Sequence, residues 1–253
     1  MDTLVAALIG FASGVASGAI GIGGAILSTP GIRWALDAPA LIAVGTTLPV
    51  IIPSALTGVI AYVRTGFVET RAAMVAAGAG GCFAVFGALT TKLVRGELLL
   101  IATAVFILIL AWRMIPRGDE DEERPQRFQP TVPVLLVVGA VSGFVAGLLG
   151  VGGGVILVPV LSGLLRFPIK TAIGTSLAVV AAQAIPATVT HALIGNIDWS
   201  IAGGLVIGVI PGARIGSRLA IATEDKKLRE IVAFALAVLA LIFGGTELRQ
   251  LLK

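Results

Sequence analysis

The sequence predicts an all-α integral membrane protein built from two homologous halves. Of its 253 residues, 57% are hydrophobic and only 13% are charged, and the mean hydropathy is +1.04. A soluble domain carries roughly a quarter charged residues, so this composition excludes a large extramembrane enzyme. The charges lie in short patches between apolar stretches that are long enough to cross a bilayer at about 20 residues per helix.

Apolar blocks follow one another along the chain, four on each side of a charged connector. The first four cover residues 4–32, 38–63, 72–91 and 98–112, and the last four cover residues 132–165, 171–197, 199–222 and 231–245. Between them lie five consecutive acidic residues flanked by Arg and Pro, a composition typical of a solvated linker. We therefore divide the chain into a first membrane repeat (1–115), a charged connector (116–131) and a second membrane repeat (132–253).

The two halves resemble each other in sequence. A shift of 129 residues aligns 10–66 with 139–195 without a gap, and 17 of the 57 pairs are identical. The identical pairs include Ser13/Ser142, Gly21/Gly150, Pro30/Pro159 and Thr46/Thr175. An internal duplication in a membrane protein is most characteristic of transporters, in which the pathway runs between the two copies.

The first block of each half is interrupted by glycines. Block 132–165 has 34 uncharged residues, which is too long for one straight span and too short for two spans with a turn. The interruptions are Gly21-Ile22-Gly23-Gly24 and Gly150-Val151-Gly152-Gly153-Gly154. Glycine destabilises a helix and permits unusual backbone angles. The freed backbone is tolerated in a bilayer only where it is buried in protein or lines an aqueous cavity.

Two topologies compete, and the basic residues discriminate between them. If every block crosses once, in parallel repeats, the 18 basic residues divide eight against ten. If the first block of each half is re-entrant, they divide thirteen against five, as the positive-inside rule requires. We therefore expect inverted repeats, each with a re-entrant first helix plus three transmembrane helices. Both termini would then lie outside the cytoplasm of a cell (inner) membrane, and the connector would be cytoplasmic.

The glycine interruptions are the first candidate substrate-binding residues. Each precedes an apolar helical segment, whose first N–H groups could bind an anion with the help of the helix dipole. The alternative is that the glycines only allow close helix packing, as the Gly14/Gly18 and Gly143/Gly147 spacings suggest. The candidates are Gly21, Gly23, Gly24, Gly150, Gly152, Gly153 and Gly154.

Polar side chains in the second block of each half are further candidates. Their positions recur in both halves, although hydroxyls in membrane helices often bond only to their own backbone. They are Thr46, Thr47, Thr175, Ser176 and the amide of Gln183. The single histidine, His191, is a candidate proton relay near a membrane boundary. Arg214 is a candidate vestibule residue, although most arginines at such positions extend to lipid head groups.

The residue types that are missing restrict the chemistry. No Asp or Glu lies near the middle of an apolar block, which argues against a cation as substrate. The sequence contains no His/Cys metal cluster and no Ser-His-Asp set, so we expect no enzyme, catalytic residue, metal or cofactor. The basic residues form no continuous face with interleaved aromatics, so nucleic acid is not expected as a partner.

Several motifs resemble those of the sulfite exporter TauE/SafE family over nearly the whole chain. They are the duplicated Ser-Gly-x-x-x-Gly-x-x-Gly-x-Gly-Gly pattern (13–24, 142–153), the Ala-x-Gly-Thr-[Thr/Ser]-Leu copies (43–48, 172–177) and Gly195-Asn196-Ile197-Asp198. Ala25 replaces the third glycine of the first copy, and Ala182 stands opposite Pro53, so the two half-sites are not strictly equivalent.

This resemblance implies a multi-pass permease for sulfite, organosulfonates and similar small sulfur oxyanions, working by alternating access between the halves. The partners would be a small anionic substrate and the lipid bilayer. The sequence does not decide whether the protein forms a homo-oligomer. An anion channel, or a membrane scaffold without transport activity, are the alternatives.

Cysteines introduced at Asp37 and Lys170 test the re-entrant topology. We expect a membrane-impermeant thiol reagent to label Asp37→Cys from outside the cell and to reach Lys170→Cys only from the cytoplasmic side. An N-terminus located in the cytoplasm would contradict this topology.

Overall fold

The computed structural model describes residues 2–91, 109, 130–150 and 152–251, and every regular element in them is a helix. The elements are α1 (Asp2–Ile20), α2 (Ala25–Ala35), α3 (Ala40–Arg64), α4 (Thr70–Thr90), α6 (Val132–Leu149), α7 (Gly154–Pro159), the π-helix η2 (Val160–Leu164), α8 (Ile169–Leu193), α9 (Trp199–Ala222) and α10 (Asp225–Leu251). The predicted span 98–112 and most of the connector 116–131 lie outside the described residues, apart from Ile109, Pro130 and Thr131.

Six described helices are long and apolar enough to cross a membrane, namely α1, α3, α4, α6, α8 and α9. Their outward faces carry large apolar side chains, as a surface in contact with lipid requires. Examples are Leu8, Met74, Phe86, Ile207 and Leu219, each more than half exposed. The prediction of an all-helical, multi-pass membrane protein is confirmed to this extent.

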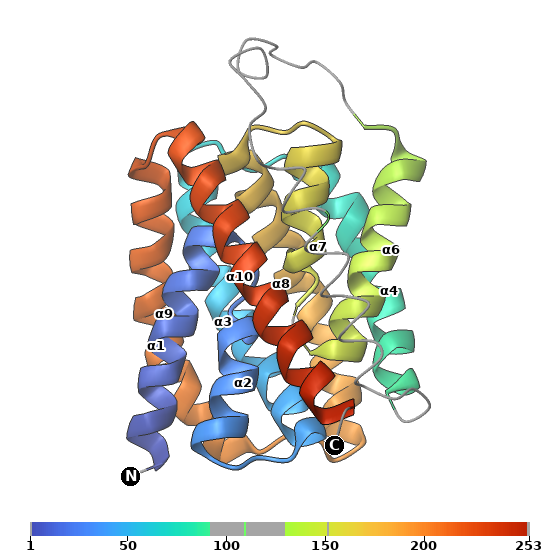
Figure 1. The fold of residues 1–253 in the computed structure, drawn as a ribbon. Helices are drawn as coiled ribbons and strands as arrows, with labels where there is room; N and C mark the ends of the chain where they lie inside the picture. The colour runs from blue at the N-terminus through green and yellow to red at the C-terminus, as the bar shows by residue number, and fades with distance from the viewer. Residues whose placement is uncertain (1, 92–108, 110–129, 151, 252–253) are drawn as a thin grey trace.

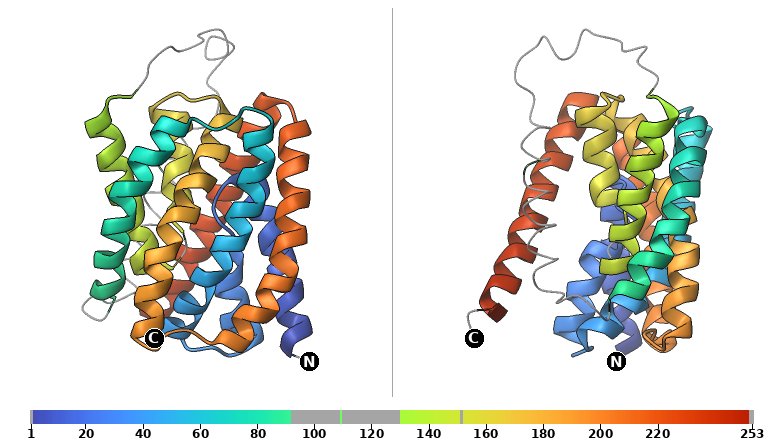
Figure 2. Two further views of the ribbon diagram at one scale, coloured as in Figure 1. Left: turned by 180° about the vertical axis from the view of Figure 1, so that it is seen from behind. Right: turned by 90° about the vertical axis from the view of Figure 1, so that its right-hand side faces the viewer.

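Short helices fold back beside the first helix of each half. In Figure 1, α1 rises from the N-terminus, and α2 descends again to a connection with α3 at the same end of the bundle. Helix α6 starts at the opposite end and runs downwards, while α7 returns towards the end from which α6 came. The views from behind and from the side in Figure 2 show the same arrangement. Accordingly, α1 and α6 run in opposite directions.

Glycines bring α1 against α9, and α6 against α4. A Cβ atom added at Gly10, Gly14 or Gly18 of α1 would overlap a backbone carbonyl oxygen of α9. The same holds for Gly139, Gly143 and Gly147 of α6 against α4. Small residues at these contacts let the backbones approach closely, which is how membrane helices associate without a hydrophobic driving force. Each first helix therefore packs along a helix of the other predicted half.

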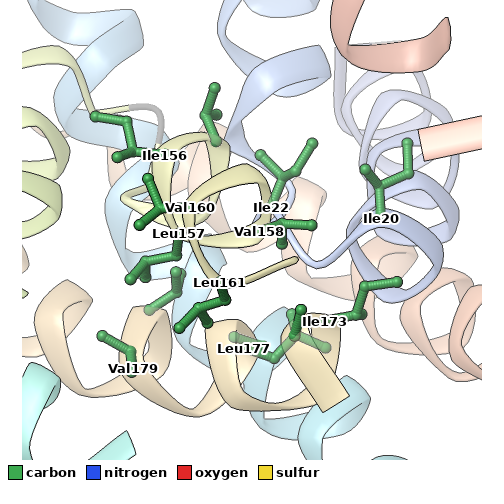
Figure 3. Close-up of a cluster of buried hydrophobic side chains, with 14 of the residues drawn as sticks. Ile20, Ile22, Ile156, Leu157, Val158, Val160, Leu161, Ile173, Leu177 and Val179 are labelled. Carbon is green, nitrogen blue, oxygen red and sulfur yellow. The ribbon is translucent and has the colours of Figure 1, made fainter. Parts of the chain in front are cut away.

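The core lies around α7 and η2, whose residues Gly154–Ser162 are all buried. Figure 3 shows Leu157, Val158 and Leu161 facing Ile173 and Leu177 of α8, with Ile20 and Ile22 of the first half beside them. Pro159 carries no N–H to continue the α-helical hydrogen bonds, and the chain proceeds as a π-helix. This apolar packing encloses the points at which α1 and α6 end.

Polar contacts fix both ends of the bundle. Asp198 caps α9, since its carboxylate accepts hydrogen bonds from the N–H groups of Ser200 at 2.9 Å and Ile201 at 3.1 Å. The Ser200 hydroxyl, followed by the Ile201 N–H, holds the pKa of this carboxyl below its usual range. At the other end, Lys170 at the start of α8 pairs with Asp225 at the start of α10 at 2.9 Å.

Two glycines of α9 test whether close helix packing stabilises the fold. An added Cβ at Gly208 would overlap the backbone of α1, whereas one at Gly203 would meet nothing within 4 Å. We expect Gly208→Ala to lower the free energy of unfolding by about 1–3 kcal/mol, the usual cost of overpacking. Gly203→Ala should be neutral or slightly stabilising because alanine favours a helix. Thermal unfolding of the detergent-purified variants measures both, and equal stabilities would refute the packing role.

Candidate functional site

Glycines with left-handed backbone angles separate the paired helices. The first turn, Gly21 to Gly24, joins α1 to α2, and Gly21, Gly23 and Gly24 have φ values of +83°, +86° and +87°. The second turn, formed by Gly150, Gly152 and Gly153, joins α6 to α7, with φ values of +62° at Gly150 and +77° at Gly152. Only glycine adopts these angles without steric cost. In contrast to Gly24, Gly153 has a right-handed φ of −61°, so the two turns differ in backbone conformation.

The two turns lie against each other in the middle of the bundle. A Cβ added at Gly152 would lie 2.9 Å from the carbonyl oxygen of Ile22. Ile51 of α3 and Val180 of α8, whose numbers differ by 129, flank both turns. A Cβ at Gly23 would lie 3.1 Å from Ile51 and 2.7 Å from Val180, and one at Gly152 would lie 3.4 Å and 3.5 Å from them. The structure therefore places the two glycine motifs, both candidate substrate-binding segments in the sequence, side by side.

Side chains of the long helices cover the carbonyl groups near each helix end. Tyr62 donates to the Gly18 carbonyl at 3.1 Å, and His191 Nε2 lies 3.0 Å from the Gly147 carbonyl. The donors of these two bonds differ by 129 in residue number, and so do their acceptors. The same is true of a second pair of bonds. Ser176 donates to the Gly21 carbonyl at 2.9 Å. The Thr47 hydroxyl lies 3.1 Å from the Gly150 carbonyl and also 2.9 Å from the Val44 carbonyl of its own helix. Both hydroxyls of this second pair link one predicted half to the other.

A group of four buried serines surrounds the first turn. Ser13 and Ser28 both donate to the Gly24 carbonyl, and the Ser28 hydroxyl also lies 2.8 Å from the Ser13 hydroxyl. Ser54 donates to Ser17 at 2.8 Å. The sequence indicated Ser54 only as the position opposite Gln183, and it predicted no site role for Ser13, Ser17 or Ser28. The available signal was weak, since single hydroxyls in apolar blocks usually bond within their own helix.

Five backbone N–H groups of the two turns, unlike the carbonyls named above, have no partner among the described residues. Within the described part of the chain, no hydrogen bond is donated by the N–H groups of Ile22, Gly23, Gly24, Gly152 or Gly153. These residues are buried. A buried amide without an acceptor costs free energy, and an oxyanion would supply acceptors to several of them at once. The arrangement therefore favours an anionic ligand.

Gln183 of α8 is fully buried beside the second turn. Its Nε2 donates to the Ser142 hydroxyl at 2.9 Å and lies 3.4 Å from the Gly139 carbonyl. Its Oε1 has no hydrogen-bond partner among the described residues. A Cβ at Gly153 would lie only 2.7 Å from this oxygen, so the glycine provides the space that the amide occupies.

The remaining candidates lie further from the turns. The Thr46 hydroxyl of α3 accepts from the Asp198 N–H at 2.9 Å, which ties α3 to the connection before α9. The Thr175 hydroxyl of α8 accepts from the Glu69 N–H at 2.9 Å, which ties α8 to the connection before α4. Arg214 is exposed on α9. Among the described residues, no group of three or more His, Cys, Asp or Glu could hold a metal ion.

Comparisons with known proteins identify the family. The family model described as sulfite exporter TauE/SafE matches residues 6–243. The probable membrane transporter protein YunE of Bacillus subtilis (strain 168) is 23% identical, covering 96% of each chain. A probable membrane transporter protein of Xylella fastidiosa (strain 9a5c) is 30% identical over 92% of this chain and 89% of its own. No solved structure matches the chain.

Thr47 and Thr57, both on α3, test the bond between the halves. Thr47 reaches the Gly150 carbonyl of the second turn as well as the Val44 carbonyl of its own helix, whereas Thr57 donates only to Pro53 of its own helix at 2.7 Å. We expect Thr47→Val to cost about 1–3 kcal/mol because it leaves a buried carbonyl without a donor. Thr57→Val should cost less than about 0.5 kcal/mol. Thermal unfolding in detergent compares them, and a Thr47→Val variant as stable as Thr57→Val would exclude this role.

Proposed function

Because the chain belongs to the TauE/SafE family of membrane transporters, which are not enzymes, we propose that it carries small sulfur oxyanions such as sulfite or organosulfonates. The observation that carries this proposal is the imbalance of hydrogen bonding at the two turns. Carbonyls at Gly18, Gly21, Gly24, Gly147 and Gly150 already accept from side chains. The N–H groups of Ile22, Gly23, Gly24, Gly152 and Gly153 in the same turns have no acceptor among the described residues, so the site offers donors.

An oxyanion fits this imbalance better than a cation does. Its oxygens accept several hydrogen bonds, and the N-terminus of α2 directs a partial positive charge at the first turn. A cation would need several free carbonyl or carboxylate oxygens. Five carbonyls at the helix ends and turns are already engaged, and those of Ile22 and Gly152 are left without a donor among the described residues. In this proposal the substrate contacts the N–H groups of Gly23, Gly24, Gly152 and Gly153, with Gln183 beside them. Thr46 and Thr175 hold the connections in place.

The halves act as inverted repeats in this proposal. Three observations support it. Helices α1 and α6 run in opposite directions. Helices α3 and α8 are each 25 residues long, and their bounds differ by 129 residues. The contacts at the turns occur in pairs with the same offset. A pseudo-twofold axis in the membrane plane would then pass between the two turns.

Re-entrant hairpins follow from the same geometry. Helix α2 has 11 residues, and α7 with η2 also has 11, which is about half of a membrane span. The connections after α3, η2 and α9 lie together at the end of the bundle opposite the N-terminus. Arg64, Arg166, Lys170, Lys226 and Lys227 lie in or beside these connections. By the positive-inside rule this end is cytoplasmic, and both termini lie outside.

Alternating access would require the two turns to separate from one side at a time. The Thr47 and Ser176 hydroxyls bind carbonyls of the opposite half, so rocking of one half against the other would stretch these two bonds. Each bond contributes only about 1 kcal/mol net, which is small enough to break in a conformational cycle. The glycine contacts between α1 and α9, and between α6 and α4, also join the two predicted halves, so the same rocking would shift the helices of each pair against one another.

Sulfite flux into proteoliposomes tests the proposal, with the turns probed by Gly153→Leu. A leucine there would displace the Gln183 amide, so we expect the variant to insert normally but to lose sulfite flux by at least about tenfold. Gly203→Leu, on an open surface of α9, should keep wild-type flux. Wild-type flux that does not saturate would indicate a channel instead, and no wild-type flux of any sulfur oxyanion would indicate a scaffold.

His191 is the proposed proton relay, and the first half suggests how to test it. Tyr62 occupies the corresponding position and makes the same bond to a helix-end carbonyl, but a phenol does not titrate near neutral pH. We expect His191→Tyr to fold and insert normally and to lose the stimulation of sulfite flux by a pH gradient. A variant whose flux still responds fully to the gradient would exclude His191 as the relay.

A further inference from the structure

The hydrogen-bond network fixes the orientation of the Gln183 amide. Ser142 donates its single hydroxyl proton to the Gly139 carbonyl at 2.9 Å, so the Ser142 oxygen can only accept from Gln183. The Gly139 carbonyl, 3.4 Å from the same end of the amide, also only accepts. Two acceptors therefore face this end, and it must be the NH₂ group. The carbonyl end, Oε1, consequently points away from α6.

This oxygen faces the second turn. The position of a Cβ at Gly153 lies 2.7 Å from Oε1, and the side chain as a whole has no exposed surface. Gly80 of α4 closes the other side, because a Cβ there would overlap the amide nitrogen. The amide is thus held by α4 and α6 and aimed at the glycine turn. A buried acceptor without a donor costs about 1–3 kcal/mol, a cost that an apolar side chain would avoid.

The first turn differs from the second at the corresponding place. There the nearest atoms to a Cβ at Gly24 are the Ser54 hydroxyl oxygen at 3.2 Å and atoms of Ser17 and Ser13. The hydroxyls of these serines already have hydrogen-bond partners, whereas Gln183 Oε1 has none among the described residues and can only accept. The site therefore combines unpaired N–H donors, which suit oxyanion oxygens, with one acceptor that no oxyanion oxygen can satisfy unless it carries a proton.

We propose that Gln183 Oε1 determines specificity by accepting a hydrogen bond from a donor on the transported anion. The preferred substrates would then be oxyanions that carry a hydroxyl, ammonium or acidic proton, such as hydrogen sulfite or a hydroxyalkyl or aminoalkyl sulfonate. Fully deprotonated dianions and purely alkyl sulfonates would leave the acceptor unpaired and bind less well. This inference rests on the proposed function and narrows its substrate class.

Two sulfonates of matched size test the inference. Isethionate and 1-propanesulfonate differ by a hydroxyl in place of a methyl group, and both compete with sulfite for the purified protein. We expect isethionate to compete at least about tenfold better with the wild type, because a site that hydrogen-bonds a hydroxyl rejects the analogue that lacks it. The ratio of the two competition strengths, isethionate over 1-propanesulfonate, should fall to about one in Gln183→Met. Equal competition by the two sulfonates in the wild type would overturn the inference without any variant.

Ser54→Ala is the matched control, since Ser54 holds the corresponding position in the first half. The ratio should survive in Ser54→Ala, and a ratio that is lost there but kept in Gln183→Met would assign the acceptor to the serine and overturn the inference. Failure of the proposed function gives a different result, since sulfite and both sulfonates would then neither bind nor cross the membrane. Flux of both sulfonates without discrimination would leave the permease intact and remove only the role of Gln183.

Discussion

A helix that stops inside an apolar medium must have its freed backbone groups satisfied by the protein itself. In this chain two helices, α1 and α6, end at glycine turns in the middle of the bundle. Water is absent from the hydrocarbon region, so each uncovered carbonyl or N–H group costs several kcal/mol. The rest of the structure depends on how this requirement is met.

The requirement accounts for the polar residues of α3 and α8. Both helices are largely apolar, yet Thr47, Tyr62, Ser176 and His191 each lie within hydrogen-bond distance of a carbonyl at or beside an interrupted helix end. Because two of these bonds cross between the predicted halves, the same contacts that cover the carbonyls also hold the halves together. Five N–H groups of the turns are left without an acceptor among the described residues, and in our proposal this surplus of donors lets the site bind an anion.

Part of this arrangement could be predicted from the sequence. Adjacent glycines in a long apolar block located both turns, and the 129-residue offset identified Thr47/Ser176 and Tyr62/His191 as corresponding positions. The direction of each side chain could not be predicted. Neighbouring residues on a helix point about 100° apart, and so Thr46 reaches a connection while Thr47 reaches a turn. The grouping of four serines around Gly24 could not be predicted because they come from three different helices whose packing the sequence does not show.

A structure determined with selenite, a heavier analogue of sulfite, tests the central claim most directly. The selenium atom can be located by its anomalous scattering, independently of the protein density. The account predicts one peak between the two turns, within hydrogen-bond reach of the N–H groups of Gly23 and Gly152. Peaks confined to the basic residues at the ends of the bundle, with none at the turns, would contradict it.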